Sequence, residues 1–185
     1  MKDKVVIGVA GMPGAGKSIL EEVAKKMGYA IVAMGDEIRE EAKRRKLEPT
    51  PENLGKIMLM LRKEEGAVVV ARRCIPKVKN AKENVVVVDG IRSLEEANEF
   101  RRHFQNFTLV AIHASPETRF QRLFQRKRSD DPEGWETFME RDLRELSVGL
   151  GNAIATADYM VVNEGTRDQL RKKVREVLKR VTRIG

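Results

Sequence analysis

The sequence predicts an α/β fold in which a parallel sheet of about five strands lies between layers of helices. Short runs of β-branched, apolar residues alternate along the chain with longer stretches whose apolar residues have helical spacing. Repeated strand–helix alternation requires right-handed crossovers, which place helices on both faces of a parallel sheet. A glycine-rich stretch, "GMPGAGKS" at residues 11–18, also separates the first predicted strand from the first predicted helix.

The elements follow in order from these patterns. Strands are predicted at residues 4–11, 29–35, 83–90, 107–114 and 157–165. Helices are predicted at residues 19–28, 36–46, 50–66, 93–104, 115–128, 129–146 (after an initial turn) and 166–181.

Local signals mark the starts of two helices, and one segment is ambiguous. Thr50 followed by Pro51 is typical of an N-cap and a first helical position. Ser93 followed by Glu96 has the spacing of a capping box. Residues 67–79 have the β-branched content of a strand, whereas Pro76 and the need to cross the sheet again favour an interrupted helix.

Composition limits the possible function classes. A length of 185 residues suits one domain, and no linker or repeat divides it. The net charge of +8 favours an anionic partner, although charged helix faces in solvent explain it more simply than nucleic-acid binding does. Aromatic residues make up only 5%, which argues against a stacking platform for single-stranded nucleic acid.

We expect a cytoplasmic protein without a membrane span. The start of the chain, "MKDK", leads directly into a strand without a signal-peptide pattern, and no apolar run reaches about eighteen residues. The single cysteine, Cys74, excludes an intrachain disulfide and a multi-cysteine metal site, and we interpret it as an apolar core residue.

The glycine-rich stretch matches the P-loop pattern of Gly11, four residues, Gly16, Lys17 and Ser18. Glycines allow backbone N–H groups to approach phosphate oxygens, and the start of the next helix adds a positive dipole end. Lys17 would reach the β- and γ-phosphates of ATP, and the Ser18 hydroxyl would ligate Mg²⁺. The predicted fold is therefore a three-layer α/β/α P-loop NTPase fold. The predicted ATP-binding residues of the loop are Gly11, Met12, Pro13, Gly14, Ala15, Gly16, Lys17 and Ser18.

Other sequence features distinguish between the activities that a P-loop supports. The Asn-Lys-x-Asp that selects guanine in GTPase switches is missing, and a motor or AAA-type ATPase usually needs a longer chain. Arginines instead follow several strand ends, where three converging phosphate groups would need them.

These arginines lie in stretches that resemble nucleoside monophosphate kinases. "GDEIR" resembles the stretch with which that family grips its acceptor, which implies substrate-binding roles for Gly35, Asp36 and Arg39. "DGIRS" resembles the Asp-Gly-(Phe-Pro)-Arg-Ser/Thr stretch, which implies that Arg92 holds the acceptor phosphate and that Asp89 lies near the metal. The Phe-Pro pair is contracted to one isoleucine here, so the resemblance does not assign AMP as the acceptor.

The resemblance extends to a lid and to the last strand. "QRKRSDD" is similar to the family's lid motif, which implies catalytic roles for Arg128 and Arg141 and a cofactor-binding role for Arg126. "ADYMVVNEGT" is similar to the base-adjacent turn of the dephospho-coenzyme A kinase and cytidylate kinase branches, which implies that Asn163 contacts the cofactor. The lid has neither a long β-hairpin nor zinc-binding cysteines. Over essentially the whole chain, the sequence most resembles the archaeal adenylate-kinase-related, dephospho-coenzyme A kinase-like proteins.

The predicted function is transfer of the ATP γ-phosphate, with Mg²⁺, to a nucleoside monophosphate or a related small phosphorylated acceptor. An acceptor-binding helical insertion is expected at about 35–80 and a short helical lid at about 126–147. Because phosphoryl transfer depends mostly on positioning and charge, the catalytic residues would be Lys17, Asp89, Arg92, Arg128 and Arg141. Two alternatives remain open: a dephospho-coenzyme A kinase, and an ATP-dependent, RNA-associated switch or ATPase. The sequence leaves the oligomeric state and the identity of the acceptor open.

Overall fold

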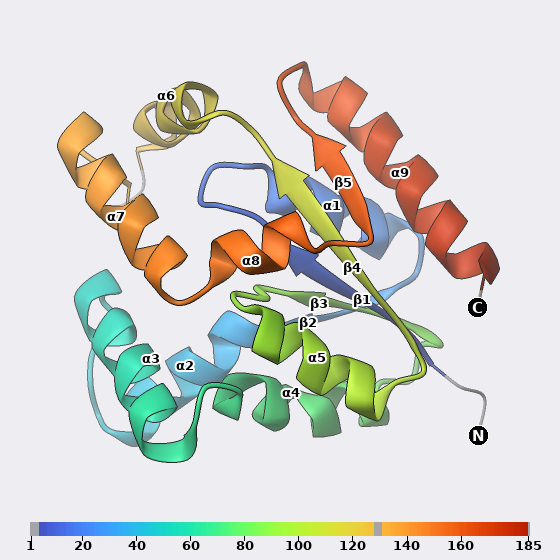
Figure 1. Ribbon diagram of the computed structural model, residues 1–185, viewed down its shortest axis with the longest axis horizontal. Coiled ribbons are helices and arrows are strands. Elements are labelled where there is room, and N and C mark those ends of the chain that lie inside the picture. Colours follow the sequence, from blue (N-terminus) through green and yellow to red (C-terminus); the bar gives the residue numbers. More distant parts are fainter. Residues whose placement is uncertain (1–3, 128–130, 185) are drawn as a thin grey trace.

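A parallel sheet between two helical layers forms the centre of the molecule (Figure 1). The computed structural model describes residues 4–127 and 131–184. Within them the strands are β1 (Val5–Ala10), β2 (Ala30–Ala33), β3 (Val85–Asp89), β4 (Asn106–His113) and β5 (Tyr159–Val162), arranged in the order β2-β3-β1-β4-β5. All four strand pairings are parallel, which confirms the predicted α/β class.

The helices of the described residues occupy both faces of this sheet. They are α1 (Lys17–Lys26), α2 (Met34–Arg44), α3 (Pro51–Glu65), α4 (Val69–Asn80), α5 (Leu94–His103), α6 (Pro116–Arg126), α7 (Trp135–Ser147), α8 (Leu150–Ala155) and α9 (Arg167–Ile184). One apolar core joins β1, β3 and β4 to α2, α3, α4, α5 and α8, and a second joins the opposite face to α1 and α9. The side-chain alternation of each strand divides residues between these cores: Val86 and Val88 face the first, and Val87 faces the second.

The ambiguous segment is helical. Residues 69–80 form α4, with Pro76 inside it, and six of its side chains are buried against the first core, including the fully buried Cys74. Burial raises the pKa of the Cys74 thiol to about 12, so the thiol stays protonated at neutral pH and acts as the apolar filler that was predicted. The short helix α8 was not anticipated, because six residues are too few to show a helical period.

Of the two helix-start signals predicted from the sequence, the structure confirms one fully and the other in part. The Thr50 hydroxyl accepts a hydrogen bond from the Asn53 backbone N–H at 3.2 Å, which confirms the N-cap of α3. Ser93 caps α5 by accepting from the Glu96 N–H at 3.2 Å. The Glu96 carboxylate, however, accepts from the Arg92 N–H at 2.8 Å and not from Ser93, so the reciprocal half of the capping box is displaced by one residue.

The strand order places the functional loops together. The glycine-rich loop follows β1, which lies between β3 and β4 at the middle of the sheet. Because parallel strands end at the same edge, the segments after β3, β4 and β5 border this loop. Figure 1 shows α6 and α7 at the same end of the molecule as α2 and α3.

Candidate active site

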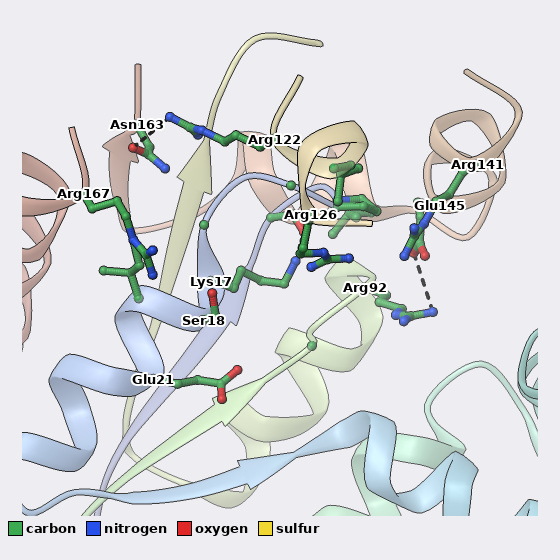
Figure 2. A pocket seen from close by; sticks show the side chains of 18 of the residues that line it. Lys17, Ser18, Glu21, Arg92, Arg122, Arg126, Arg141, Glu145, Asn163 and Arg167 are labelled. Carbon is green, nitrogen blue, oxygen red and sulfur yellow. Dashed lines mark hydrogen bonds and ion pairs between the residues drawn. The ribbon is translucent and has the colours of Figure 1, made fainter. Parts of the chain in front are cut away.

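A pocket of about 940 Å³ lies at the carboxyl edge of the sheet and is lined by residues from seven segments of the chain. The glycine-rich loop and α1 form its floor, and side chains of α6, α7 and the loop after β5 form its upper wall (Figure 2). Seven of its described lining residues are cationic: Lys17, Arg39, Arg92, Arg122, Arg126, Arg141 and Arg167. Such a concentration of positive charge in one concavity fits a polyanionic ligand.

The loop has a conformation that only glycine adopts easily. Gly14 and Gly16 have φ angles of 82° and 110°, in the left-handed region, and Gly16 directly precedes the first residue of α1. A Cβ atom on Gly16 would lie 2.5 Å from the Asn163 amide nitrogen, so space as well as φ requires glycine there. The turn aims the free N-terminus of α1 at the pocket, which suits phosphate binding.

Lys17 lies inside the loop that precedes it. Its ammonium donates to the Gly11 carbonyl at 2.5 Å and to the Met12 carbonyl at 3.5 Å. Burial lowers the pKa of Lys17, and the negative charges of Asp89 and Glu145 partly oppose this shift. An ammonium that has lost much of its hydration binds a phosphate oxygen more strongly than an exposed one does.

Asn163 and Arg122 brace the loop from the side of β5. The Asn163 amide donates to the Ala15 carbonyl at 2.8 Å and is buried, so it supports the P-loop backbone directly. Its amide oxygen accepts from an Arg122 nitrogen at 3.4 Å. Another nitrogen of the Arg122 guanidinium, Nη1, is buried and makes no hydrogen bond within the described part of the chain. Arg167 projects into the same end of the pocket (Figure 2).

Arg92 is held in place from two directions. Its backbone N–H donates to Glu96, which is fully buried and also pairs with Arg62 at 2.6 Å. Its side chain contacts the Met58 sulfur at 2.8 Å and lies 3.6 Å from the Glu145 carboxylate of α7, the contact drawn in Figure 2. Arg92 therefore links the loop after β3 to the α7 wall of the pocket.

Two carboxyl groups, one on α1 and one at the end of β3, lie close together. Glu21 lies one turn after Ser18 on α1, and its carboxyl contacts that of Asp89 at the end of β3. Burial raises the pKa of Glu21, and the nearby Asp89 raises it further. The Oδ1 atom of Asp89 is buried and receives no hydrogen bond from any donor group of the described residues.

A buried ion pair joins α6 to α7, and its arginine also donates a hydrogen bond to the P-loop. Arg119 of α6 and Asp142 of α7 are almost fully buried, and both guanidinium Nη atoms bond the carboxylate. The same guanidinium donates to the Pro13 carbonyl at 3.2 Å and to the Ala114 carbonyl at 3.2 Å. An aromatic cluster also joins the two helices: Phe120, Phe124, Trp135 and Phe138.

The structure brings most of the predicted site residues to this pocket. They are Gly11, Pro13, Gly14, Gly16, Lys17, Ser18, Arg39, Arg92, Arg126, Arg141 and Asn163. Met12 and Ala15 belong to the loop, but their side chains are buried in the two cores.

Four other predicted residues have different surroundings. Gly35 and Asp36 do not line the pocket, and the Asp36 carboxylate, largely exposed, pairs with Arg39 at 2.6 Å. Asp89 does not line the pocket itself. Its chain neighbour Gly90 does, and so does Glu21, whose carboxyl is close to that of Asp89. Arg128 lies outside the described residues. Arg126, by contrast, lines the pocket as predicted, and its Nε atom donates a hydrogen bond to the Asp131 carboxylate at 3.0 Å.

Sequence reasoning missed four charged residues of the pocket. They are Glu21, Arg122, Glu145 and Arg167. Three of them lie one helical turn from a predicted site residue: Glu21 follows Lys17 by four positions, Glu145 follows Arg141 by four, and Arg122 precedes Arg126 by four. Helical spacing therefore could have found them. Arg167 comes after the last strand, β5, just as the predicted Arg39 and Arg92 come after β2 and β3, so its place in the chain could have indicated it.

No helix of the described residues has both the length and the apolar character needed to cross a membrane. Likewise, those residues contain no group of three or more His, Cys, Asp or Glu side chains arranged to hold a metal ion.

Solved structures with a similar fold include small-molecule kinases. A shikimate kinase from Bacteroides thetaiotaomicron superposes with a TM-score of 0.62 at 18% identity, covering 95% of this chain and 98% of that one. A gluconokinase from Sinorhizobium meliloti gives a TM-score of 0.61 at 15% identity, covering 98% and 95%. At these identities the similarity shows the fold alone, which is that of P-loop kinases.

Sequence relatives are much more similar. The UPF0200 protein of Hyperthermus butylicus is 48% identical over 182 residues, which are 98% of this chain and 97% of the relative. The UPF0200 protein of Methanocaldococcus jannaschii is 48% identical over 179 residues, or 96% and 90%. A family model described as an AAA domain also matches residues 10–139. The chain therefore belongs to the UPF0200 family and, through residues 10–139, to the AAA domain family, and it has the fold of a P-loop kinase.

Proposed function

We propose that this protein transfers the γ-phosphate of ATP, with Mg²⁺, to a small phosphorylated acceptor such as a nucleoside monophosphate. One observation carries the proposal. The pocket that contains the P-loop is also lined by arginines from three other segments of the chain: Arg39, Arg92 and Arg141. A protein that only hydrolyses ATP needs the first anion site but not the second.

The donor nucleotide would occupy the P-loop end of the pocket. The backbone amides of the loop and the Lys17 ammonium would bind its phosphates. Arg122 and Arg167 project from opposite walls near Asn163 (Figure 2), so a planar base could lie between their guanidinium groups. Asn163 would act by holding the loop rather than by reading the base, because its amide is buried against Ala15.

The residues at the foot of the P-loop fit a Mg²⁺ ion. The Ser18 side chain is exposed in the pocket, and a buried oxygen of Asp89 receives no hydrogen bond from the described residues. Hard oxygen ligands of this kind suit Mg²⁺. When bound, the ion would neutralise charge on the donor phosphates.

The acceptor would be held by its anionic group against Arg92 and Arg39. Arg92 is preorganised, because the fully buried Glu96 accepts a hydrogen bond from its backbone N–H. Its side chain faces Glu145 at 3.6 Å, and an acceptor phosphate would compete with that carboxylate for the guanidinium. Arg141 and Arg126, on the α6–α7 wall, would stabilise the charge that develops during transfer.

A second candidate is ATP hydrolysis without an acceptor, in a nucleotide-dependent switch. The match of residues 10–139 to an AAA domain favours it. The kinase proposal draws its support from the arginines that line the pocket in addition to the P-loop and from the similarity to a shikimate kinase and a gluconokinase.

One assay separates these candidates. The purified chain is incubated with ATP and Mg²⁺, alone and with each of AMP, CMP, dCMP, UMP, GMP, dTMP and dephospho-coenzyme A, and phosphorylated products are separated by anion-exchange chromatography. Because two similar structures are named for other acceptors, shikimate and gluconate complete the panel.

The kinase proposal expects a phosphorylated product from one nucleoside monophosphate, at a rate at least tenfold above ATP hydrolysis without acceptor. Transfer to dephospho-coenzyme A, shikimate or gluconate instead would keep a kinase but overturn the phosphorylated nucleoside acceptor. ATP hydrolysis that no acceptor accelerates would overturn the kinase and support the switch.

A further inference from the structure

Large apolar side chains are exposed together on one side of α6 and α7. Within the described part of the chain nine such side chains are exposed, and five of them belong to these two helices: Phe124, Trp135, Met139, Leu143 and Leu146. Their exposed fractions range from 37% for Met139 to 61% for Leu143. We call these five residues the outer apolar face. A contiguous exposed apolar patch of this kind is typical of an interaction site.

Four of the five residues form one stripe along α7. Trp135, Met139, Leu143 and Leu146 follow one another at spacings of four, four and three, which brings them within about 80° of one another around the helix. Phe124 continues the stripe onto α6, because the Phe120 ring contacts both the Phe124 and the Trp135 rings, at centroid distances of 5.7 Å and 5.2 Å. Figure 1 shows α7 at the outer edge of the molecule.

The pocket side of α7 is a different side of the helix. Arg141 and Glu145 line the pocket, and at about 100° per residue they lie more than about 100° from the middle of the stripe. A partner can therefore cover the outer apolar face without entering the pocket.

The charges beside the stripe are complementary to themselves. Glu136, Glu140 and Arg144 are exposed and lie on the same flank of the stripe, with the two acidic residues nearer the start of α7 and the arginine nearer its end. When two copies of a helix pack antiparallel about a two-fold axis, the same flanks meet and the start of one faces the end of the other. Glu140 of each copy would then lie beside Arg144 of the other. A parallel arrangement would separate these charges.

We propose that the outer apolar face binds a second copy of this chain, in a two-fold dimer whose α7 helices pack antiparallel. Such an interface uses the same surface on both copies, as closed dimers do. Met139 would face Leu143 of the second copy, and Trp135 would lie near its Leu146. Aromatic residues and methionine are enriched at the centres of protein interfaces, where charged residues are depleted, and the outer apolar face has this composition.

The flanking charges also argue against other partners. An anionic membrane surface or a nucleic acid would require a basic flank, whereas this one carries two acidic residues and one arginine. The inference goes beyond the proposed function and does not depend on it. It has a consequence for the pocket, because α6 and α7 carry Arg122, Arg126 and Arg141, and a dimer would restrain the movement of both helices.

Sedimentation equilibrium of the ligand-free chain at about 1–100 µM tests the proposal. Wild-type protein is expected to approach twice the chain mass. Leu143→Glu should weaken dimerisation at least tenfold, because it places four carboxylates where apolar side chains and two existing glutamates meet. Leu59→Glu is the matched control: Leu59 is 50% exposed but lies on α3, so this variant should dimerise like wild type.

Charge reversal tests the antiparallel arrangement itself. Glu140→Arg and Arg144→Glu should each weaken the dimer at least threefold, since each places like charges side by side across the interface. The double variant Glu140→Arg with Arg144→Glu should return to within twofold of the wild-type dissociation constant, because the pairs are restored with their signs exchanged. Two single losses without recovery in the double variant would overturn the antiparallel dimer.

Wild-type protein that stays monomeric at about 100 µM would overturn the proposal, and a change in ATP turnover by Leu143→Glu in such a monomer would assign the outer apolar face to movement within one chain. A dimer that Leu143→Glu leaves unchanged uses another surface and would overturn it as well. Circular dichroism checks that each variant is folded, and Leu143→Ser replaces Leu143→Glu if the latter does not fold. Sedimentation requires neither ATP nor an acceptor, so its outcome does not depend on whether the protein is a kinase.

Discussion

At the scale of single residues, the pocket depends on charged side chains whose positions are fixed by hydrogen bonds. Lys17 is enclosed by the carbonyls of its own loop, and Arg92 is anchored through its backbone to the buried Glu96. Such preorganisation matters because charge stabilisation in phosphoryl transfer requires groups that need not move during the reaction.

Replacing Lys17 should remove turnover while leaving the fold intact. Lys17→Ala deletes the ammonium nearest the P-loop carbonyls, and we expect the rate of ATP turnover to fall by about two orders of magnitude or more. Steady-state release of ADP measures it. Lys26→Ala, on the exposed side of the same helix, should retain the wild-type rate. A Lys17→Ala variant with more than a tenth of wild-type turnover would contradict the proposed donor site.

Replacing Arg92 should affect the acceptor more than ATP. For Arg92→Ala we expect the acceptor KM to rise by about 10- to 100-fold with a change of less than about threefold in the KM for ATP, since one charge-assisted contact is lost. Initial rates over a matrix of both substrate concentrations separate the two constants. Arg102→Ala, on the exposed face of α5, is the control. If acceptor KM and kcat both stayed at wild-type values, Arg92 would not bind the acceptor.

At the scale of elements, helices α6 and α7 act as one unit. The Arg119–Asp142 pair and four aromatic rings join them, and Arg119 connects the unit to the Pro13 carbonyl of the P-loop. The unit carries Arg122, Arg126, Arg141 and Glu145 into the pocket. Its movement against the P-loop would therefore shift four charged groups together.

Removing one partner of the buried pair should destabilise the fold strongly. Asp142→Ala leaves the Arg119 guanidinium buried without its counterion, and we expect a loss of about 3–5 kcal/mol in the free energy of unfolding. Chemical denaturation followed by circular dichroism measures it. The exposed Glu140→Ala on the same helix should change stability by less than about 0.5 kcal/mol. A loss below about 1 kcal/mol for Asp142→Ala would show that the pair does not hold α6 to α7.

The helices α2 and α4 are joined by Glu41, whose contribution should depend on pH. Hydrogen bonds from Arg45 and Arg73 lower the pKa of this nearly buried carboxyl below its ordinary value of 4.5. A carboxyl with a lower pKa in the folded state stabilises the fold above its unfolded pKa, and this stabilisation is lost as the pH falls through the folded pKa.

Glu41→Gln should therefore cost about 2 kcal/mol in the free energy of unfolding at pH 7, because charge-assisted bonds are lost. The difference between wild type and variant should shrink below the ordinary pKa of 4.5 as the wild-type carboxyl protonates. Urea denaturation at a series of pH values measures it, with the more exposed Glu40→Gln as control. A difference that is constant down to the lowest pH at which the protein folds would refute the assigned cause.

At the scale of the whole molecule, the net charge of +8 is divided between the pocket and the outer helix faces. Seven cationic side chains line the pocket, whereas basic residues of α9 such as Lys172, Lys179 and Arg180 lie on its exposed surface. A basic surface of this kind attracts polyanions weakly and in a salt-dependent way.

We expect RNA binding by the intact protein to be weak and non-specific. Fluorescence anisotropy with labelled single-stranded and duplex RNA at about 0.15 M salt should give dissociation constants no tighter than about 10⁻⁶ M, with little dependence on sequence. ATP should not change them, because the exposed basic residues Lys172, Lys179 and Arg180 do not line the pocket. Nanomolar binding that ATP alters would favour the RNA-associated switch over the kinase.

The sequence by itself determined the features that depend on local chemistry. The P-loop needs glycine at Gly14 and Gly16 for backbone reasons, Thr50 and Ser93 cap helices over three residues, and β-branched runs alternate with helical stretches in the order that a parallel sheet requires. These signals act between residues close in the chain, so they can be identified without coordinates.

Only the tertiary structure decided which side chains share the pocket. Most of the ambiguous segment 67–79 lies in α4 (Val69–Asn80), because burial of the apolar face of this helix against the first core outweighs the strand propensity of the valines. The tertiary structure buried Asn163 against Ala15, placed Asp36 outside the pocket, and brought Glu21 to Asp89 and Glu145 to Arg92. Each of these depends on contacts between elements distant in sequence, whose distances and burial no local pattern encodes.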